Sequence, residues 1–77
     1  MPRYFFHVID GRAMLDTEGT EFPNLEKARS EAVRTAGSII ASEGIEAWGN
    51  NRWRMVLADE KGAVLFSLDF LADKHGI

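Results

Sequence analysis

The alternation of apolar and polar residues divides the chain into one helical segment and several segments with a strand pattern. Between Leu25 and Glu43 apolar residues recur at intervals of three and four, the spacing of an amphipathic helix. Seven of them fall within an arc of roughly 140° around the helix axis. They are Leu25, Ala28, Ala32, Val33, Ala36, Ile39 and Ile40. Since three of the seven are alanine, the helix can approach its packing partner closely, and the bulk of the core must come from strands.

Both ends of this helix carry capping residues. Asn24 suits the N-cap, and Glu26 places a carboxylate in the first turn, where the positive end of the helix dipole favours it. Gly44 suits the left-handed position that follows a helix, and Ile45 is expected to pack back on the last turn. Arg29 falls inside the apolar arc, so we expect its stem to lie along the core edge while its guanidinium reaches water.

Two strands are predicted before the helix. Arg3 to Asp10 is rich in aromatic and β-branched residues and ends at Asp10-Gly11, a favoured hairpin turn. Its two faces carry Tyr4, Phe6 and Val8 on one side and Phe5, His7 and Ile9 on the other. Because both faces are apolar apart from His7, this should be a central strand with the helix on one side. A second strand around Arg12 to Leu15 is expected to return antiparallel.

Two further strands are predicted after the helix, from Arg52 to Asp59 and from Ala63 to about Phe70. The turn between them is Asp59-Glu60-Lys61-Gly62, which has the aspartate and glycine that a type I turn favours at its first and fourth positions. Each strand alternates, so each has one face of bulky apolar side chains that can pack against the helix.

The hairpin formed by these strands has two competing registers. A three-residue loop with a glycine bulge pairs Leu57 with Leu65, whereas a four-residue loop pairs Ala58 with Ala63. We prefer the four-residue loop, because it gathers six apolar side chains on one face. These are Trp53, Met55, Leu57, Val64, Phe66 and Leu68. The same register sets two charged residues opposite each other on the outer face, Arg52 and Asp69.

Together these elements predict an α+β fold in one domain over residues 1–77. Its order is ββαββ, a four-stranded antiparallel sheet with one helix packed on one face. A chain of 77 residues buries only about 60% of the surface that it exposes when unfolded, so an isolated core would be marginally stable. The sequence contains no cysteine, so disulfides cannot add stability. A homodimer interface is the remaining ordinary source of burial.

If the helix covers the face of Tyr4, Phe6 and Val8, the opposite face carries an apolar strip that a monomer would seldom leave exposed. The strip consists of Phe5, His7, Ile9, Val56 and Leu65. We therefore predict that these residues form the interface of a homodimer. In a two-fold contact near His7, protonation of both copies would place like charges together, so we expect dimerisation to weaken in acid.

No set of residues in the sequence requires a reaction or a ligand. Two histidines without cysteine do not supply the converging ligands of a metal site, and His7 has no nucleophile or acid partner that the pattern brings to it. The acidic turn over residues 16–21 lacks the spacing of a calcium loop, and no glycine-rich phosphate loop occurs. We expect no enzymatic activity, no cofactor, no metal and no small-molecule ligand.

The charge pattern gives little reason to expect an acidic partner. Net charge is −3, the predicted pI is near 5.2 and the nine cationic residues are scattered along the chain. Arg52 and Arg54, with Trp53 between them, form the one patch whose composition resembles a nucleic-acid contact. Alternation points Trp53 to the core and the arginines outward, so nucleic acid is the less favoured partner. The apolar run at the start is too short for a signal peptide, and we expect a cytoplasmic protein without membrane association.

Several motifs resemble a known family. They are the opening Met1-Pro2-Arg3-Tyr4-Phe5-Phe6-His7-Val8, Asp10-Gly11, the Asp16 to Gly19 turn, Phe22-Pro23-Asn24-Leu25 before the helix, and Asp59-Glu60-Lys61-Gly62. Together they resemble a family of short, mostly alphaproteobacterial proteins known only as a domain of unknown function, and the resemblance covers nearly the whole chain. It implies no activity and no catalytic residue.

A lesser likeness is to antitoxins of the HicB type, in which an acidic glycine turn and Phe-Pro-Asp-Leu precede an alanine-rich helix. Here Asn24 replaces the aspartate, and the second hairpin is not part of that motif. Our first hypothesis is therefore a small non-enzymatic protein-interaction module, homodimeric and with a protein partner. The alternative is a nucleic-acid-associated regulator resembling a HicB-type antitoxin, which would use Arg52 and Arg54.

Overall fold

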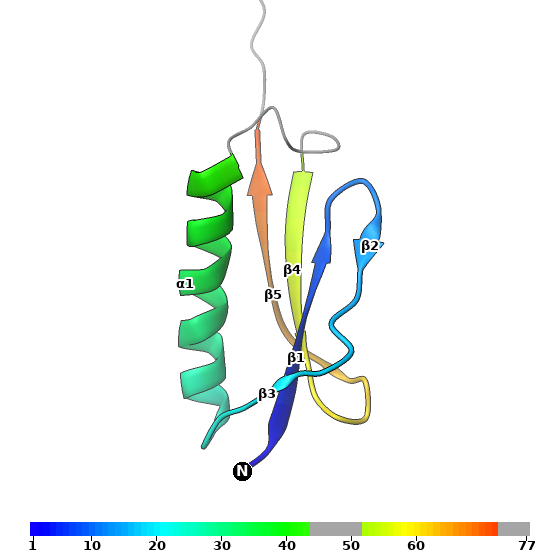
Figure 1. Ribbon diagram of the computed structural model, residues 1–77, viewed down its shortest axis with the longest axis vertical. Coiled ribbons are helices and arrows are strands. Elements are labelled where there is room, and N and C mark those ends of the chain that lie inside the picture. The colour runs from blue at the N-terminus through cyan, green and yellow to red at the C-terminus, as the bar shows by residue number, and fades with distance from the viewer. Residues whose placement is uncertain (44–51, 73–77) are drawn as a thin grey trace, which may run out of the picture.

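The computed structural model describes residues 1–43 and 52–72 and confirms the predicted α+β class (Figure 1). One helix, α1 (Leu25–Glu43), packs on one face of an antiparallel sheet. The strands are β1 (Arg3–Ile9), β2 (Ala13–Met14), β3 (Thr20–Glu21), β4 (Arg52–Ala58) and β5 (Val64–Leu71). Their order across the sheet is β2-β1-β4-β5, and β3 pairs with the other end of the β1 edge. The four predicted strands are therefore present, and the two-residue strand β3 is an addition.

Helix α1 has the predicted bounds because a local cap fixes its start. The Oδ1 atom of Asn24 accepts the N–H of Lys27 at 2.9 Å. The three alanines of the apolar arc are fully buried, but Val33, at one end of the arc, is 55% exposed. The prediction that Val33 faces the core is wrong, because the stripe of α1 that touches the sheet is narrower than the arc. The predicted cap residues Gly44 and Ile45 lie outside the described residues.

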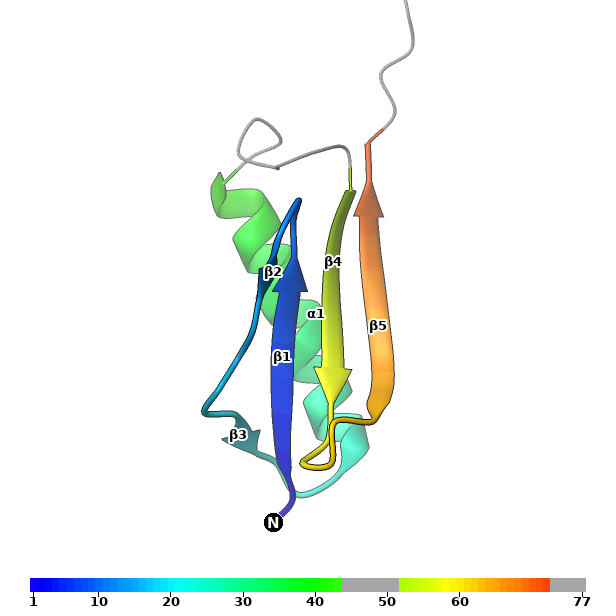
Figure 2. The same cartoon turned by 90° about the vertical axis from the view of Figure 1, so that its right-hand side faces the viewer.

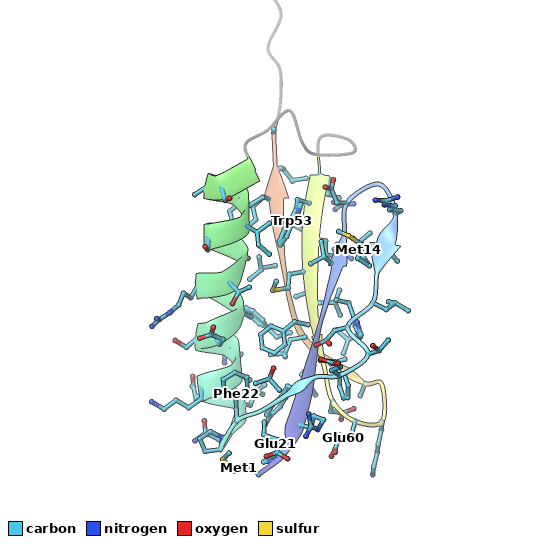
Figure 3. The ribbon with its side chains drawn as sticks, in the orientation of Figure 1. Met1, Met14, Glu21, Phe22, Trp53 and Glu60 are labelled. Atoms are coloured by element: carbon cyan, nitrogen blue, oxygen red, sulfur yellow. The ribbon has the colours of Figure 1, made fainter. Side chains whose placement is uncertain are left out.

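Strand side chains fill the space between the helix and the sheet, as Figure 3 shows. Trp53, Met55 and Leu57 of β4 are 1%, 2% and 0% exposed and pack beneath the alanines of α1. The ring of Phe70 meets Trp53 edge-on, with 5.9 Å between ring centroids. The guanidinium of Arg29 lies 5.2 Å from the centre of the Phe66 ring, so its stem follows the core edge as expected.

The loop of the β4–β5 hairpin is three residues long, so the preferred four-residue loop is wrong. The N–H of Asp59 donates to the carbonyl of Ala63, and the N–H of Gly62 donates to the carbonyl of Asp59, both at 3.0 Å. Gly62 has a φ of 84°, a left-handed conformation that glycine adopts without strain. The turn chemistry therefore decides the loop length.

A β-bulge restores the alternation beyond this loop. Ala58 pairs with Val64, but Leu57 pairs with Phe66, so Leu65 is the extra residue. As predicted, Phe66 and Leu68 share the core face with the apolar residues of β4. Val64 lies before the bulge and is 63% exposed, contrary to the prediction. The shifted register also sets Asp69 opposite Arg54 and not Arg52.

Substitution of Leu57 tests this core. Leu57→Ala is expected to lower the free energy of unfolding by about 3 kcal/mol, because the side chain is fully buried between α1 and the sheet. Leu15→Ala makes the same chemical change at a position that is 68% exposed and should cost less than about 0.5 kcal/mol. Urea denaturation measures both variants, and equal losses would show that the core is elsewhere.

Candidate functional site

The face of the sheet opposite α1 carries no second layer among the residues 1–43 and 52–72 (Figure 2). We call it the open face and define it by the predicted interface residues Phe5, His7, Ile9, Val56 and Leu65. The structure brings the first four together, because His7 pairs with Val56 on the neighbouring strand. Leu65 lies one strand further, at the bulge of β5. Ile9 and Leu65 are 40% and 38% exposed, and the other three are partly buried.

His7 is held in place by two contacts at the edge of the open face. Its Nδ1 atom accepts the backbone N–H of Asp16 at 3.0 Å, and its ring stacks on Phe5 with 6.5 Å between centroids and an interplanar angle of 14°. A nitrogen that accepts a hydrogen bond carries no hydrogen of its own, so Nδ1 is the acceptor nitrogen of this ring and the Asp16 N–H fixes the orientation of the ring.

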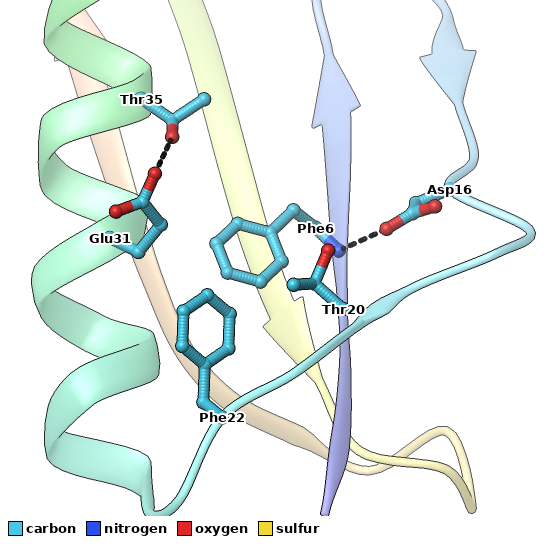
Figure 4. A pocket seen from close by; sticks show the side chains of 6 residues that line it. All are labelled: Phe6, Asp16, Thr20, Phe22, Glu31 and Thr35. Atoms are coloured by element: carbon cyan, nitrogen blue, oxygen red, sulfur yellow. Dashed lines mark hydrogen bonds between the residues drawn. The ribbon is translucent and has the colours of Figure 1, made fainter.

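The side chain of Asp16 closes the outer edge of β1. Its carboxylate accepts three backbone N–H groups, from Phe6 at 3.1 Å, Glu18 at 3.1 Å and Gly19 at 3.0 Å (the first is drawn in Figure 4). We call this carboxylate with its three donors, together with the bond from the Asp16 N–H to His7, the Asp16 clip. It lies between the two places where short strands pair with β1, at Arg3–Tyr4 and at Val8–Ile9. Sequence reasoning missed it.

The clip also determines the ionisation of Asp16. Partial burial would raise the pKa of this carboxyl, but the three N–H donors lower the pKa below the ordinary value of 3.8. The side chain is therefore fixed as an acceptor of hydrogen bonds and is not poised to donate a proton near neutral pH. This assigns Asp16 a structural role.

Gly19 allows the clip to lie against β1. Its φ is 72°, and a Cβ atom at this position would lie 2.8 Å from the carbonyl oxygen of Tyr4 and 2.9 Å from the ring of Phe5. Both the backbone conformation and the close approach therefore require glycine.

A hollow of about 250 Å³ lies between β1, β3 and α1 (Figure 4). Its lining residues are Phe6, Asp16, Thr20, Phe22, Glu31 and Thr35. The rings of Phe6 and Phe22 are 6.0 Å apart, and the Thr35 hydroxyl donates to Glu31 at 3.2 Å. The side chains of Thr35 and Glu31 are thus already bonded to each other. Among the residues that the structure describes, no group of three potential metal ligands occurs.

The two arginines of the predicted nucleic-acid patch converge on one carboxylate. Arg54 donates from Nε to Asp69 at 2.7 Å and from Nη2 at 3.0 Å, and the nearest guanidinium nitrogen of Arg52 lies 3.7 Å from the same side chain. The hydrogen bond to Asp69 raises the pKa of Arg54, and the same bond lowers the pKa of Asp69. Two donors of Arg54 are thus engaged within the chain. A second hollow of about 130 Å³ is bordered by Ile9, Gly11, Arg52 and Arg54.

Comparison with known proteins gives one finding. A family model described as Domain of unknown function (DUF6894) matches residues 3–71. No curated protein and no solved structure gives a significant match. In the described part of the chain, no helix has both the length and the apolar character needed to cross a membrane.

Replacement of Asp16 tests the clip. Asp16→Asn is expected to lower the free energy of unfolding at neutral pH by about 2 kcal/mol, because the amide has no charge and a single acceptor oxygen for three donors. A folded-state pKa below 3.8 means that the ionised group stabilises the fold above that pH and that this contribution is lost as pH falls through the lower folded-state value. The difference from wild type should therefore shrink below about pH 4.

Urea denaturation followed by tryptophan fluorescence at several pH values measures this difference. Glu60→Gln is the matched control, because it neutralises an exposed carboxylate in the β4–β5 turn and should change stability little at any pH. If the loss in Asp16→Asn stayed the same from neutral to strongly acidic pH, the charge of Asp16 would have no part in the clip.

Proposed function

The chain belongs to the family described as Domain of unknown function (DUF6894), and we propose that it acts as a small non-enzymatic interaction module that binds a second copy of itself through the open face. The observation that carries this proposal is the open face itself. One side of the sheet is packed against α1, while the other side has partly exposed Phe5, His7, Ile9, Val56 and Leu65 with no layer over them among the described residues.

The small size of the core supports the same proposal. Eight apolar residues are buried in the described part of the chain, and four of the eight are alanine. A core of this volume is marginal for an isolated chain, and burial of the open face against another copy would add to it. A two-fold contact is self-complementary, so one apolar strip can cover its own copy.

A non-enzymatic role is supported by the chemistry of the candidate residues. His7 and Asp16 are polar groups at the open face, and each is bonded to the chain in a way that fixes it. The absence of cysteine fits a reducing compartment, so we also propose a cytoplasmic location. Further protein partners would bind the self-associated form.

The substitution Phe5→Glu tests this interface. It places a charge within the apolar strip, so the two-fold contact should be lost, the mass of the particle should halve and the dissociation constant of the contact should rise by about 100-fold or more. Sedimentation equilibrium measures both quantities. Ile9→Lys changes a position that is 40% exposed, so it should have the same effect without disturbing the fold.

Val33→Glu is the matched control for these variants. It adds the same charge as Phe5→Glu at an apolar position that is 55% exposed on α1, so it should leave the particle mass unchanged. A wild-type chain that is monomeric at about 100 μM, or folded Phe5→Glu and Ile9→Lys variants with the wild-type mass, would overturn the proposal.

One observation favours a second candidate, a nucleic-acid-associated regulator resembling a HicB-type antitoxin. The smaller hollow beside Arg52 and Arg54 is of a size that accepts a phosphate group next to two guanidiniums. The carboxylate of Asp69 competes for these same groups.

This candidate predicts opposite effects of two substitutions. Asp69→Asn removes the competing charge and should tighten binding to DNA or RNA, whereas Arg52→Ala with Arg54→Ala should abolish it. Binding by the wild-type chain should weaken steeply as salt is raised. Electrophoretic mobility shifts at two salt concentrations measure this. Unchanged behaviour of all three chains would exclude these arginines as the contact.

A further inference from the structure

The two edges of the sheet differ in whether their backbone groups have pairing partners. The outer edge of β1 is occupied along its length, by β3 at Arg3–Tyr4, by the Asp16 clip at Phe6 and by β2 at Val8–Ile9. The opposite edge is formed by β5, which has eight residues and no pairing partner on its outer side among residues 1–43 and 52–72. Figure 2 shows β5 at the margin of the sheet, with α1 behind β1 and β4.

Strand β5 lacks most features that protect an exposed edge from pairing. Natural proteins place lysine, proline or an inward-pointing charge on such strands, or keep them very short. Val64 to Leu71 contains no lysine and no proline, and its single charged residue, Asp69, is neutralised by Arg54 at 2.7 Å. The bulge at Leu65 lies next to the turn and leaves the rest of the strand regularly paired to β4.

Both sides of β5 are also incompletely covered. On the side of α1, Phe66, Leu68 and Phe70 pack against the core but remain partly exposed. On the other side, Leu65 and Leu71 are 38% and 67% exposed. A strand added beside β5 would cover apolar side chains on both faces of the sheet at once.

We propose that β5 pairs antiparallel with β5 of a second copy, around a two-fold axis at Leu68. This contact is separate from the open-face contact, and either contact can form without the other. It would join two sheets into one, with both helices on the same side and the two open faces continuous on the other.

The side chains of β5 select this register. Core-facing side chains must meet core-facing side chains, so the axis lies at a residue and not between two residues. The axes nearest the middle of the eight-residue strand are at Ser67 and Leu68, and Asp69 follows them. An axis at Asp69 would set the two copies of that carboxylate directly opposite each other, which is unfavourable. An axis at Ser67 would set Leu65 opposite Asp69.

The axis at Leu68 avoids both unfavourable pairings of Asp69. It sets Leu68 opposite its own copy, and it pairs Phe66 with Phe70, Leu65 with Leu71 and Ser67 with Asp69. Every large apolar side chain from Leu65 to Leu71 then faces another apolar side chain, and Asp69 faces a hydroxyl. Because edge pairing leaves the open face free, the two contacts together would give a four-chain particle with two kinds of two-fold axis.

Single-cysteine variants test the register directly, because the chain has no cysteine of its own. In the proposed register Leu68→Cys meets its own copy directly, at a spacing of about 5 Å that a disulfide can span. Ser67→Cys would lie roughly 7–8 Å from its copy, too far for an unstrained bridge. Leu68→Cys should therefore cross-link at least tenfold faster than Ser67→Cys, and faster than Lys61→Cys in the exposed turn, which reports random collision.

The reaction is run under mild oxidation at low micromolar concentration, read on non-reducing gels, both in the wild-type chain and with Phe5→Glu. The edge contact predicts the same cross-linking in both. Equal rates at all three positions, or cross-linking of Leu68→Cys that disappears with Phe5→Glu, would overturn it. Cross-linking that persists while Phe5→Glu leaves the particle mass unchanged would retain the edge contact and reject the open-face contact.

A second variant covers the case in which Leu68→Cys disturbs the core. Leu65→Cys combined with Leu71→Cys changes two exposed positions that face each other across the same axis. With Phe5→Glu present, the double variant should give a covalent dimer, whereas either single change should give little. A double variant that stays monomeric would overturn the register.

Discussion

The structure depends on the close approach of α1 to the sheet through alanine. Ala28, Ala32 and Ala36 are fully buried, and side chains of this size add little volume, so large residues of the strands must fill the space beneath them. Trp53, Met55 and Leu57 do so on β4. A single helix of this kind covers the middle of the sheet, which leaves the large side chains of β5 partly exposed. Among the residues that the structure describes, the opposite face has no layer over it. The exposure of β5 and of the open face is therefore a consequence of the small core.

The regular elements of this fold follow from short-range rules. Helix α1 begins where Asn24 caps it, because the cap is a bond between residues three apart. The faces of β1 and β4 follow from alternation, so four of the predicted interface residues do lie together on one face. Membership in a family of unknown function agrees with the resemblance drawn from the motifs.

The hairpin shows where two valid rules give different answers. Turn chemistry requires a three-residue loop, and side-chain alternation requires the faces that a four-residue loop would give. The chain satisfies both by one extra residue at Leu65, and nothing in that leucine distinguishes it from its neighbours in sequence. The Asp16 clip could not be predicted from the sequence for another reason. Its partners Phe6 and His7 lie ten and nine residues earlier, and no periodicity links such positions, so the segment has the pattern of a solvated acidic turn.

The order of β1 and β4 along the chain has a consequence for synthesis on the ribosome. β1 is an interior strand, but its partner β4 starts roughly fifty residues later, so at ordinary translation rates the apolar strand waits roughly 3 to 10 seconds for it. The residues that form β2, the Asp16 clip and β3 all follow β1 and precede α1 along the chain. They can close one edge of β1 and hold the ring of His7 before α1 has been made, so the nascent chain has a single unpaired edge left to shield.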